Sequence, residues 1–340
     1  MEFRGGWADV WRANLWCRVA SRILVRVAEF TAETFPELDR GLRAVPWAEW
    51  LPPGAPLEVR AAKHKTRLYH TGKVAEIVLE ALAATAGARP AAEGEEPLTV
   101  HVRIDGPRAT VSLDASGYHL HRRGYRTEAG PAPLRENLAA GLLLRARWDG
   151  AEPLLDPFCG SGTFPVEGAM LALRIAPGLR RSFAFERFPS HRAEAWAALK
   201  AVAQAAARRA LPAPVRGSDR DPAAVALTAR SARRAGLADH VQVGNLEVGE
   251  LEVQAPSGLL ATNPPYGHRL AGSQAALGDL GRALRGPLRE WRWAAILPEG
   301  RGAAEARLGL SVSERFPFRS GGLRLQWAQG GPANSTEEST

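Results

Sequence analysis

The chain has 340 residues, 45% of them hydrophobic, which is enough for two domains with sizeable cores. It has two cysteines, Cys17 and Cys159, and no run of about 18 apolar residues. Composition therefore argues against a disulfide-rich secreted protein and a membrane-spanning helix, and it predicts a reducing, cytoplasmic setting. The formal net charge of +8 indicates an acidic partner such as nucleic acid.

The first 130 residues alternate between predicted helices and strands, because the spacing of apolar residues changes between the helical and the extended period. The expected elements are helices over residues 7–20, 35–42 and 71–84, strands over 21–30 and 57–60, and a basic loop over 61–70. Around the Asp105-Gly106 turn, apolar residues alternate on both sides. This pattern predicts a β-hairpin over residues 98–113.

Two basic clusters without an acidic residue border this hairpin, one within residues 60–73 and one within 119–126. Clustered cations suit phosphate contacts, although such runs are as often solvated faces. The residues expected to bind nucleic acid are Lys63, Lys65, Arg67, Arg122, Arg123 and Arg126.

The stretch over residues 154–173, LLDPFCGSGTFPVEGAMLAL, predicts a strand, a tight turn and a helix. Asp156 ends the strand, and Gly160 and Gly162 let the backbone turn sharply and approach a ligand. Such a turn after the first strand is where open α/β sheets bind nucleotide-like cofactors. The simpler alternative is an ordinary loop between a strand and a helix.

Two later stretches have the same form. VRGSDRD, over residues 215–221, predicts a strand ending in acids, and Asp219 can hold the hydroxyls of a ribose or, alternatively, cap the helix that follows. LLATNPPY, over residues 259–266, is an apolar strand running into Asn-Pro-Pro-Tyr. Asp219 lies far beyond the ~20 residues expected after a nicotinamide fingerprint, which argues against a dinucleotide enzyme.

The remaining pattern completes an α/β sheet. A helix over 131–147 leads into the first strand, and a helical insert between 174 and 215 is expected to be structural. Further strands are predicted over 240–243, 259–262 and 293–297, followed by an antiparallel pair over 309–316 and 323–328. The polar tail from Gly330 is expected to be disordered.

In order, HRRGYR, APLRENLAAGLL, DPFCGSGTFPVEGA, GSDRDP and TNPPYG resemble the bacterial guanine-N2 RNA methyltransferases that carry a THUMP domain. The resemblance is to the N-terminal half of the enzyme that forms N2-methylguanosine in large-subunit (23S) ribosomal RNA. It implies an α/β class I methyltransferase with a Rossmann-like, seven-stranded, mostly parallel sheet and an N-terminal α+β domain containing THUMP. Each motif alone is moderately specific, whereas their order is specific.

The resemblance also implies a division of the chain. A partial ferredoxin-like subdomain is expected over 1–56, an RNA-binding THUMP domain over 57–130, a methyltransferase domain over 131–330 and a tail over 331–340. Relatives usually begin with an additional strand and helix, so the first subdomain is expected to be incomplete. Asn245 stands where an acid is common, and its amide oxygen would accept from the adenine amino group more weakly.

Site residues follow from the same motifs. The Asn263 side-chain oxygen and the Pro264 carbonyl are expected to accept the two N–H groups of the reacting amine. Pro265 fixes the backbone, and Tyr266 is expected to stack on the target base. The residues expected to bind S-adenosyl-L-methionine (AdoMet) are Asp156, Phe158, Cys159, Gly160, Gly162, Thr163, Asp219, Arg220, Asn245, Leu246 and Asn263.

Several alternatives stay open at this point. Transfer RNA is a rival substrate, and the NPPY motif also serves adenine-N6 DNA methylases and glutamine-N5 protein methylases. An RNA-binding assembly protein with a vestigial methyltransferase core is a further reading. No metal is expected, because none of the eight histidines has partner cysteines at ligand spacing.

Overall fold

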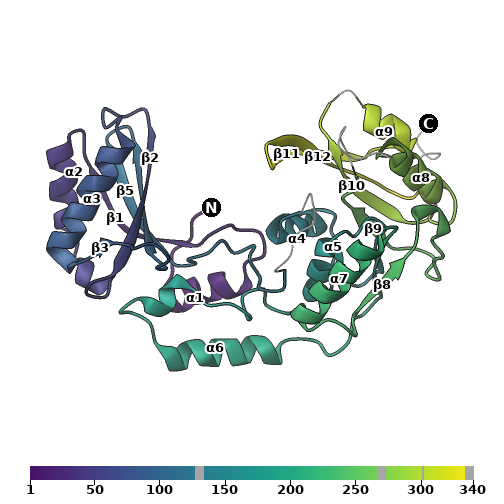
Figure 1. Ribbon diagram of the computed structural model, residues 1–340, viewed down its shortest axis with the longest axis horizontal. Coiled ribbons are helices and arrows are strands. Elements are labelled where there is room, and N and C mark those ends of the chain that lie inside the picture. Colours follow the sequence, from purple (N-terminus) through teal and green to yellow (C-terminus); the bar gives the residue numbers. More distant parts are fainter. Residues whose placement is uncertain (127–133, 266–272, 301, 334–340) are drawn as a thin grey trace. The chain divides into compact units, whose positions relative to one another are not determined.

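The computed structural model describes residues 1–126, 134–265, 273–300 and 302–333 (Figure 1). They form two compact units: Met1–Leu120 with Pro177–Ala205, and His121–Ala176 with the chain from Ala206 onward. The sequence predicted one continuous domain over 131–330, whereas the insert Pro177–Ala205 groups with the first unit. The insert joins the first unit through tertiary packing, which the spacing of apolar residues in the sequence does not reveal.

The first unit is built on a five-stranded sheet with the order β1-β5-β4-β2-β3. Its strands are β1 (Leu24–Thr31), β2 (Pro56–His64), β3 (Arg89–Pro90), β4 (Leu98–Asp105) and β5 (Arg108–Asp114). β4 and β5 form the predicted hairpin, in which Asp105 pairs with Arg108 around Gly106. The expected loop over 61–70 was partly wrong, because residues 61–64 continue β2 in parallel pairing with β4.

Helices α2 (Phe35–Arg43) and α3 (Thr71–Ala86) pack against each other and against the sheet. Leu38, Leu42 and Val78 are fully buried between them and the strands. The domain boundary expected near residue 56 falls inside this sheet, because β1 pairs with β5 along its whole length. Such a long-range pairing joins segments that look separate in the sequence.

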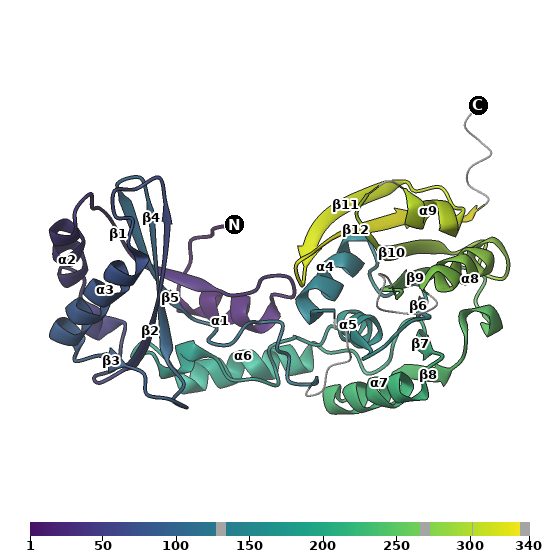
Figure 2. The same ribbon diagram turned by 45° about the horizontal axis from the view of Figure 1, so that its top comes forward.

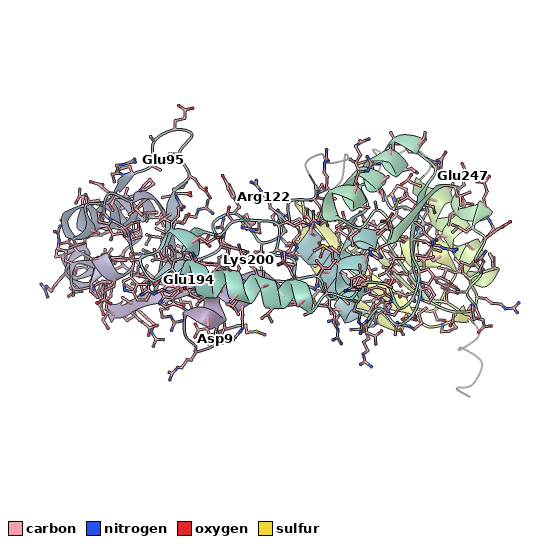
Figure 3. All side chains as sticks on the ribbon, turned by 90° about the horizontal axis from the view of Figure 1, so that it is seen from below. Asp9, Glu95, Arg122, Glu194, Lys200 and Glu247 are labelled. Atoms are coloured by element: carbon pink, nitrogen blue, oxygen red, sulfur yellow. The ribbon has the colours of Figure 1, made fainter. Side chains whose placement is uncertain are left out.

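The insert contains α6 (Ala193–Ala205), which packs against α1 (Trp7–Trp16), and the short helix η2 (Ala184–Arg187). An aromatic cluster joins them: the Phe185 ring lies 6.2 Å from Trp11 and 5.1 Å from Trp196. Lys200 on α6 lies over Trp196, with its Nζ 5.2 Å from the ring centroid (Figure 3). Aromatic packing of this kind holds the insert on the first unit.

Polar contacts fasten the insert to the end of the sheet. Arg181 donates to the carbonyl oxygens of Ser116, Tyr118 and His119 at 2.7–3.0 Å. Arg187 donates to the carbonyls of Glu96 at 2.8 Å and Pro97 at 3.1 Å. These carbonyls lie beyond the strand ends, where the sheet offers no backbone donor, so the guanidinium groups supply their hydrogen bonds.

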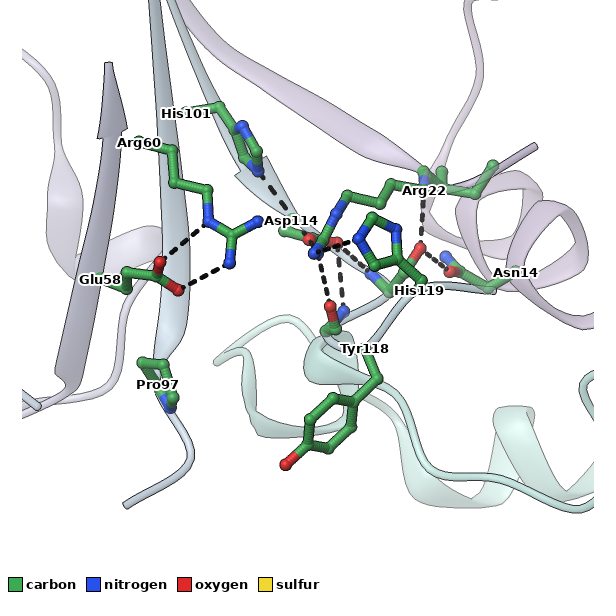
Figure 4. A network of polar contacts seen from close by, with 12 residues as sticks. Asn14, Arg22, Glu58, Arg60, Pro97, His101, Asp114, Tyr118 and His119 are labelled. Atoms are coloured by element: carbon green, nitrogen blue, oxygen red, sulfur yellow. Dashed lines mark hydrogen bonds and ion pairs between the residues drawn. The ribbon is translucent and has the colours of Figure 1, made fainter. Parts of the chain in front are cut away.

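A buried carboxylate, Asp114, organises the same corner (Figure 4). Its Oδ1 accepts from the Ser116 N–H at 2.8 Å and the Gly117 N–H at 3.1 Å, and its Oδ2 pairs with Arg22. Burial raises the pKa of Asp114, but His101, Arg22 and the Ser116 N–H outweigh burial and hold this pKa below its ordinary value. The carboxylate is therefore charged and paired.

The second unit contains a seven-stranded sheet with the order β11-β12-β10-β9-β6-β7-β8. Its strands are β6 (Leu154–Asp156), β7 (Val215–Asp219), β8 (Val241–Asn245), β9 (Leu259–Thr262), β10 (Arg292–Pro298), β11 (Glu314–Ser320) and β12 (Leu323–Gly330). The five strands β6 to β10 run parallel to one another, and β12 is antiparallel to both β10 and β11. The predicted mostly parallel sheet is thereby confirmed.

Helices cover both faces of this sheet (Figure 1). They are α4 (Glu136–Arg145), α5 (Thr163–Ala172), α7 (Pro222–Ala235), α8 (Ser273–Arg285) and α9 (Ala303–Leu308). The second unit also has the short helix η3 (Val248–Glu250), and the first unit has the short helix η1 (Trp47–Glu49). One core lies against α4, α5 and α7, and the other against α8 and α9. None of the helices in the described ranges is long and apolar enough to cross a membrane.

Gly162, at the start of α5, fixes how α5 meets α7. Its φ is +81°, and a Cβ at this position would lie 2.7 Å from Thr228 Cγ2 on α7. Thr228 is fully buried, and its hydroxyl donates to the Gly160 carbonyl at 2.9 Å. Glycine is thus required for backbone conformation and for helix packing at once.

We expect Gly162→Ala to lower the free energy of unfolding by about 1–3 kcal/mol, since it adds both backbone strain and overlap with Thr228. Gly72→Ala is the matched control, because Gly72 lies in the first turn of α3 and a Cβ there meets no atom within 4 Å. Thermal unfolding of both variants measures the difference. Equal midpoints would contradict this role of Gly162.

Candidate active site

A cavity of about 530 Å³ opens at the carboxyl ends of the parallel strands. Its wall consists of the turn after β6, the loops after β7, β8 and β9, and parts of α7 and α8. Open α/β sheets bind ligands at this edge, because the loops from neighbouring strands diverge there. The motifs that the sequence singled out therefore meet in one place.

The turn after β6 brings backbone to the cavity. Gly160 has a φ of +53°, lines the cavity, and a Cβ there would meet no protein atom within 4 Å. Cys159 is buried beside it, and burial raises the pKa of its thiol. The sequence predicted the same ligand role for both glycines, but Gly162 does not line the cavity and instead serves the packing of α5 on α7.

Asp156 is a buried carboxyl on the cavity wall. Its Oδ1 accepts from Thr262 Oγ1 at 2.6 Å and from the Phe158 N–H at 3.2 Å, so it ties β6 to the end of β9. Burial raises the pKa of Asp156 to about 7, against the lowering effect of these two bonds. A cationic ligand beside this carboxyl would favour its charged form.

Asp219 lines the cavity beside the turn that follows β6. Its Oδ2 accepts from the Gly160 N–H at 3.1 Å and its Oδ1 from the Asp221 N–H at 3.0 Å. The cap of α7 is Asp221, whose Oδ1 accepts from the Ala223 N–H at 2.8 Å. Asp221, and not Asp219, is therefore the residue that caps α7.

Asn245 is placed differently from the sequence expectation. Its Nδ2 donates to the carbonyls of Asp219 at 2.9 Å and Arg220 at 3.0 Å, and its side chain does not line the cavity. Leu246 and Glu247 line it instead. The amide therefore holds the start of the loop after β7 by satisfying two of its carbonyl groups.

Asn263, Pro264 and Pro265 follow β9 directly and line the cavity. Asn263 Oδ1 is buried and accepts no hydrogen bond from the described residues. An unsatisfied buried acceptor costs about 1–3 kcal/mol, so its position on a cavity wall points to a ligand that donates an N–H or O–H. Tyr266 lies outside the described residues.

Phe158, Thr163 and Arg220, which the sequence analysis expected to bind the cofactor, also line the cavity. Sequence reasoning missed the face of α7 formed by Ala223, Leu227 and Arg230, together with Leu134 and, on α8, Ala275, Ala276 and Asp279. The α7 residues repeat at intervals of four and three, the spacing of one helical face, and this signal could have found them.

The first basic cluster is at the surface. Lys63, Lys65 and Arg67 are all exposed at the end of β2 and in the loop after it, and Arg67 pairs with Glu33 at 3.2 Å. In the second cluster, Arg122 is exposed.

The sequence analysis expected Arg123 and Arg126 to contact RNA, but the structure places both in ion pairs with carboxylates of the second unit. The Arg123 side chain is 2% exposed and lies 3.5 Å from the buried Glu167, which also accepts from the Tyr125 hydroxyl at 3.1 Å. Arg126 donates to the Leu134 carbonyl at 2.7 Å, and it pairs with Glu136 at 3.1 Å. Buried guanidinium groups that are paired with carboxylates cannot reach a phosphate.

The site fits a nucleoside-like cofactor together with an amine. The open space over Gly160 admits a ligand against the backbone, and the Asn263 acceptor is available to a donor. Among the described residues, no three or more His, Cys, Asp or Glu side chains are grouped to hold a metal ion.

Comparisons with known families agree with this architecture. The profile of the RMKL-like methyltransferase domain matches residues 123–329, that of the THUMP domain residues 32–114, and that of the RlmL ferredoxin-like domain residues 1–24. The ribosomal RNA large subunit methyltransferase K/L of Methylococcus capsulatus is 35% identical over 96% of this chain and 46% of its own length. The chain thus spans about half of that relative.

A putative RNA methyltransferase of Synechocystis, slr0064, is 34% identical over 95% of this chain and 86% of its own. Among solved structures, the putative methyltransferase SMU.472 in complex with SAH is 30% identical, with a TM-score of 0.84 over 96% of this chain and 88% of that one. A predicted N6-adenine-specific DNA methylase from Listeria monocytogenes is also 30% identical, with a TM-score of 0.85 over 96% and 87%. The family resemblance and the fold class predicted from the sequence are confirmed, and the chain belongs to the RMKL-like methyltransferase family and carries a THUMP domain.

Proposed function

We propose that the chain transfers a methyl group from AdoMet to the exocyclic N2 amine of a guanosine in RNA, with large-subunit ribosomal RNA as the substrate. The observation that carries the proposal is the buried Asn263 Oδ1, which accepts no hydrogen bond within the described part of the chain and lies on the cavity wall. It shares that cavity with the glycine turn and Asp219.

Residues of this chain would hold AdoMet, which supplies an electrophilic methyl group when it is bound. Asp219 would accept from the ribose hydroxyls, and Leu246 would border the adenine. Asp156 would face the amino end of the methionine moiety, where its raised pKa falls as the cation approaches. The complex of SMU.472 with SAH supports this use of the cavity.

The reacting amine is a poor nucleophile, because its lone pair is delocalised into the base. Asn263 Oδ1 and the Pro264 carbonyl would accept its two N–H groups and stabilise the positive charge that develops on nitrogen. Bound AdoMet would supply the methyl group, so that the nitrogen–carbon bond would form as the carbon–sulfur bond breaks, and the amine proton would leave to solvent. No side chain is required to remove a proton first.

RNA is favoured as the substrate by the THUMP match and by the relatives named as ribosomal RNA methyltransferases. Guanosine in transfer RNA is the second candidate for the same chemistry. An adenine-N6 DNA methylase is a further alternative, because one similar structure bears that description.

Methylating ribosomal RNA, transfer RNA and DNA in vitro, followed by nucleoside mass spectrometry, tests the proposal. N2-methylguanosine in RNA would support it, and N6-methyladenine in DNA would overturn it.

We expect Asn263→Ala to reduce the rate of methyl transfer by ~10²–10³, since it removes an acceptor at the site of developing charge. AdoMet affinity, measured by calorimetry, should stay close to that of the wild type. Near-normal turnover in a folded variant would remove Asn263 from the mechanism.

Asp219→Ala should weaken AdoMet binding by about 1.5–3 kcal/mol, because the ribose hydroxyls lose a charged acceptor. Asp221→Ala is the paired control, since Asp221 caps α7 and its removal should cost about 1 kcal/mol of stability with less effect on affinity. Calorimetric titration and thermal unfolding of both variants separate the two roles. Equal reductions of affinity would contradict the assignment of Asp219.

The exposed Lys63, Lys65 and Arg67 would contact RNA phosphates from the first unit. Replacing all three with alanine should weaken RNA binding, and the slope of log affinity against log salt should fall by roughly 0.7–0.9 for each cation that binds a phosphate. AdoMet affinity should not change. The control replaces three other exposed cations of the same unit, Arg4, Arg12 and Arg89, and changes the net charge equally. Filter binding across a salt series gives the slopes, and matching slopes would show a merely solvated face.

A further inference from the structure

Strands β11 and β12 form a hairpin at one end of the seven-stranded sheet (Figure 2). This hairpin carries two arginines whose pairing is unfavourable by itself. Arg319 pairs directly with Arg324 in the antiparallel register, next to a tip made of Gly321 and Gly322, which have φ values of +57° and +81°. Directly opposite residues point to the same face and lie close together, so two like charges destabilise the pair. An anion between the two guanidinium groups would reverse this effect.

Both side chains are exposed, and within the described ranges neither forms an ion pair. The nearby carboxylates have other partners: Glu305 pairs with Arg315, and Glu314 pairs with Arg145. Glu299 donates its backbone N–H to the Arg324 carbonyl at 3.1 Å without a side-chain ion pair in the part of the chain described. Positive charge therefore remains in excess at the hairpin tip.

The register places this tip at the edge of the sheet that bears the cavity. Thr262 on β9 pairs with Ala295 on β10, so Asn263 is level with Ile296. Pro298 on β10 pairs with Leu325 on β12, so Arg324 is level with Glu299, three residues further along β10. With about 3.3 Å per residue and about 4.8 Å between strands, the Arg324 backbone lies roughly 10 Å further along and roughly 10 Å across, about 14 Å from Asn263.

The two arginines also lie on the face of the sheet that α8 covers. Leu325 and Phe318 alternate with them and pack on the core formed with α4 and α5. Successive strand residues point to opposite faces, so Arg319 and Arg324 belong to the face of α8 and α9. Because α8 contributes Ala275 and Asp279 to the cavity, the tip shares an edge with the cavity and lies on the same face of the sheet as that one wall of it.

We propose that Arg319 and Arg324 form a phosphate-binding site that holds the RNA backbone a few nucleotides from the reacting base. Two adjacent planar guanidinium groups offer several N–H donors to the oxygens of one phosphodiester. The inference rests on the proposed function, since it takes the ligand to be the RNA that is methylated. It assigns RNA contacts to the catalytic unit itself, in addition to those proposed for the first unit.

The test replaces both residues, Arg319→Ala with Arg324→Ala, in the full chain. The matched control is Arg209→Ala with Arg233→Ala, two exposed arginines of the same unit that precede β7 and end α7, at the opposite edge of the sheet. Both pairs change the net charge equally. We expect the hairpin variant to weaken binding of unmodified ribosomal RNA and to lower the salt slope by about 1 per arginine.

Two further readouts distinguish a contact from a structural role. Thermal stability of the hairpin variant should be equal to or higher than that of the wild type, because like-charge repulsion is removed. Replacing both arginines with lysine should restore part of the RNA affinity, because the charge returns without the planar arrangement of donors. AdoMet affinity should stay unchanged in all variants.

The outcomes separate this inference from the proposed function. If the wild type methylates RNA but the hairpin and control variants have the same RNA affinity and salt slope, the phosphate site is wrong and the proposed function stands. If the wild type methylates no RNA, the proposed function fails, and equal binding by both variants overturns the phosphate site independently.

Discussion

The hydrogen bonds that two carboxylates accept across neighbouring strand ends hold the site together. Asp156 ties the end of β6 to Thr262 on β9, and Asp219 ties the end of β7 to the Gly160 N–H. The three loops that leave these strands would otherwise diverge, since nothing in a parallel ladder continues beyond the last residue pair. Because both carboxylates also line the cavity, the groups that order the site are the groups that a ligand would meet.

The chain passes between its two units three times. The insert Pro177–Ala205 leaves the methyltransferase sheet after α5 and is fastened to the first unit by the Trp11, Phe185 and Trp196 rings and by Arg181. The unit that carries the THUMP domain therefore includes a segment that the linear order of motifs assigns elsewhere. Its fold should depend on that segment, because the insert supplies much of the aromatic packing around α1.

The role of each basic residue in this protein depends on whether its side chain is buried or exposed. Arg123 and Arg126 are held by Glu167 and Glu136, so they stabilise the fold of the second unit. Lys63 and Lys65 are exposed and Arg67 keeps one surface pair, which exchanges with solvent at little cost. A basic run in the sequence is the same in both cases, and only burial separates a structural cation from one that can meet a phosphate.

The sequence by itself determined the family, the mostly parallel sheet, the hairpin over residues 98–113 and the strand ends that supply part of the cavity wall. These follow from local rules: apolar spacing, glycine turns and strand ends that carry Asp156, Asp219 and Asn263. Tertiary structure alone decided that β1 joins the sheet of the first unit, that the insert returns to it, and that Gly162 serves packing against Thr228. It also decided that Asn245 holds a loop and does not line the cavity. Each of these depends on atoms from segments far apart in the chain, whose contacts no local spacing encodes.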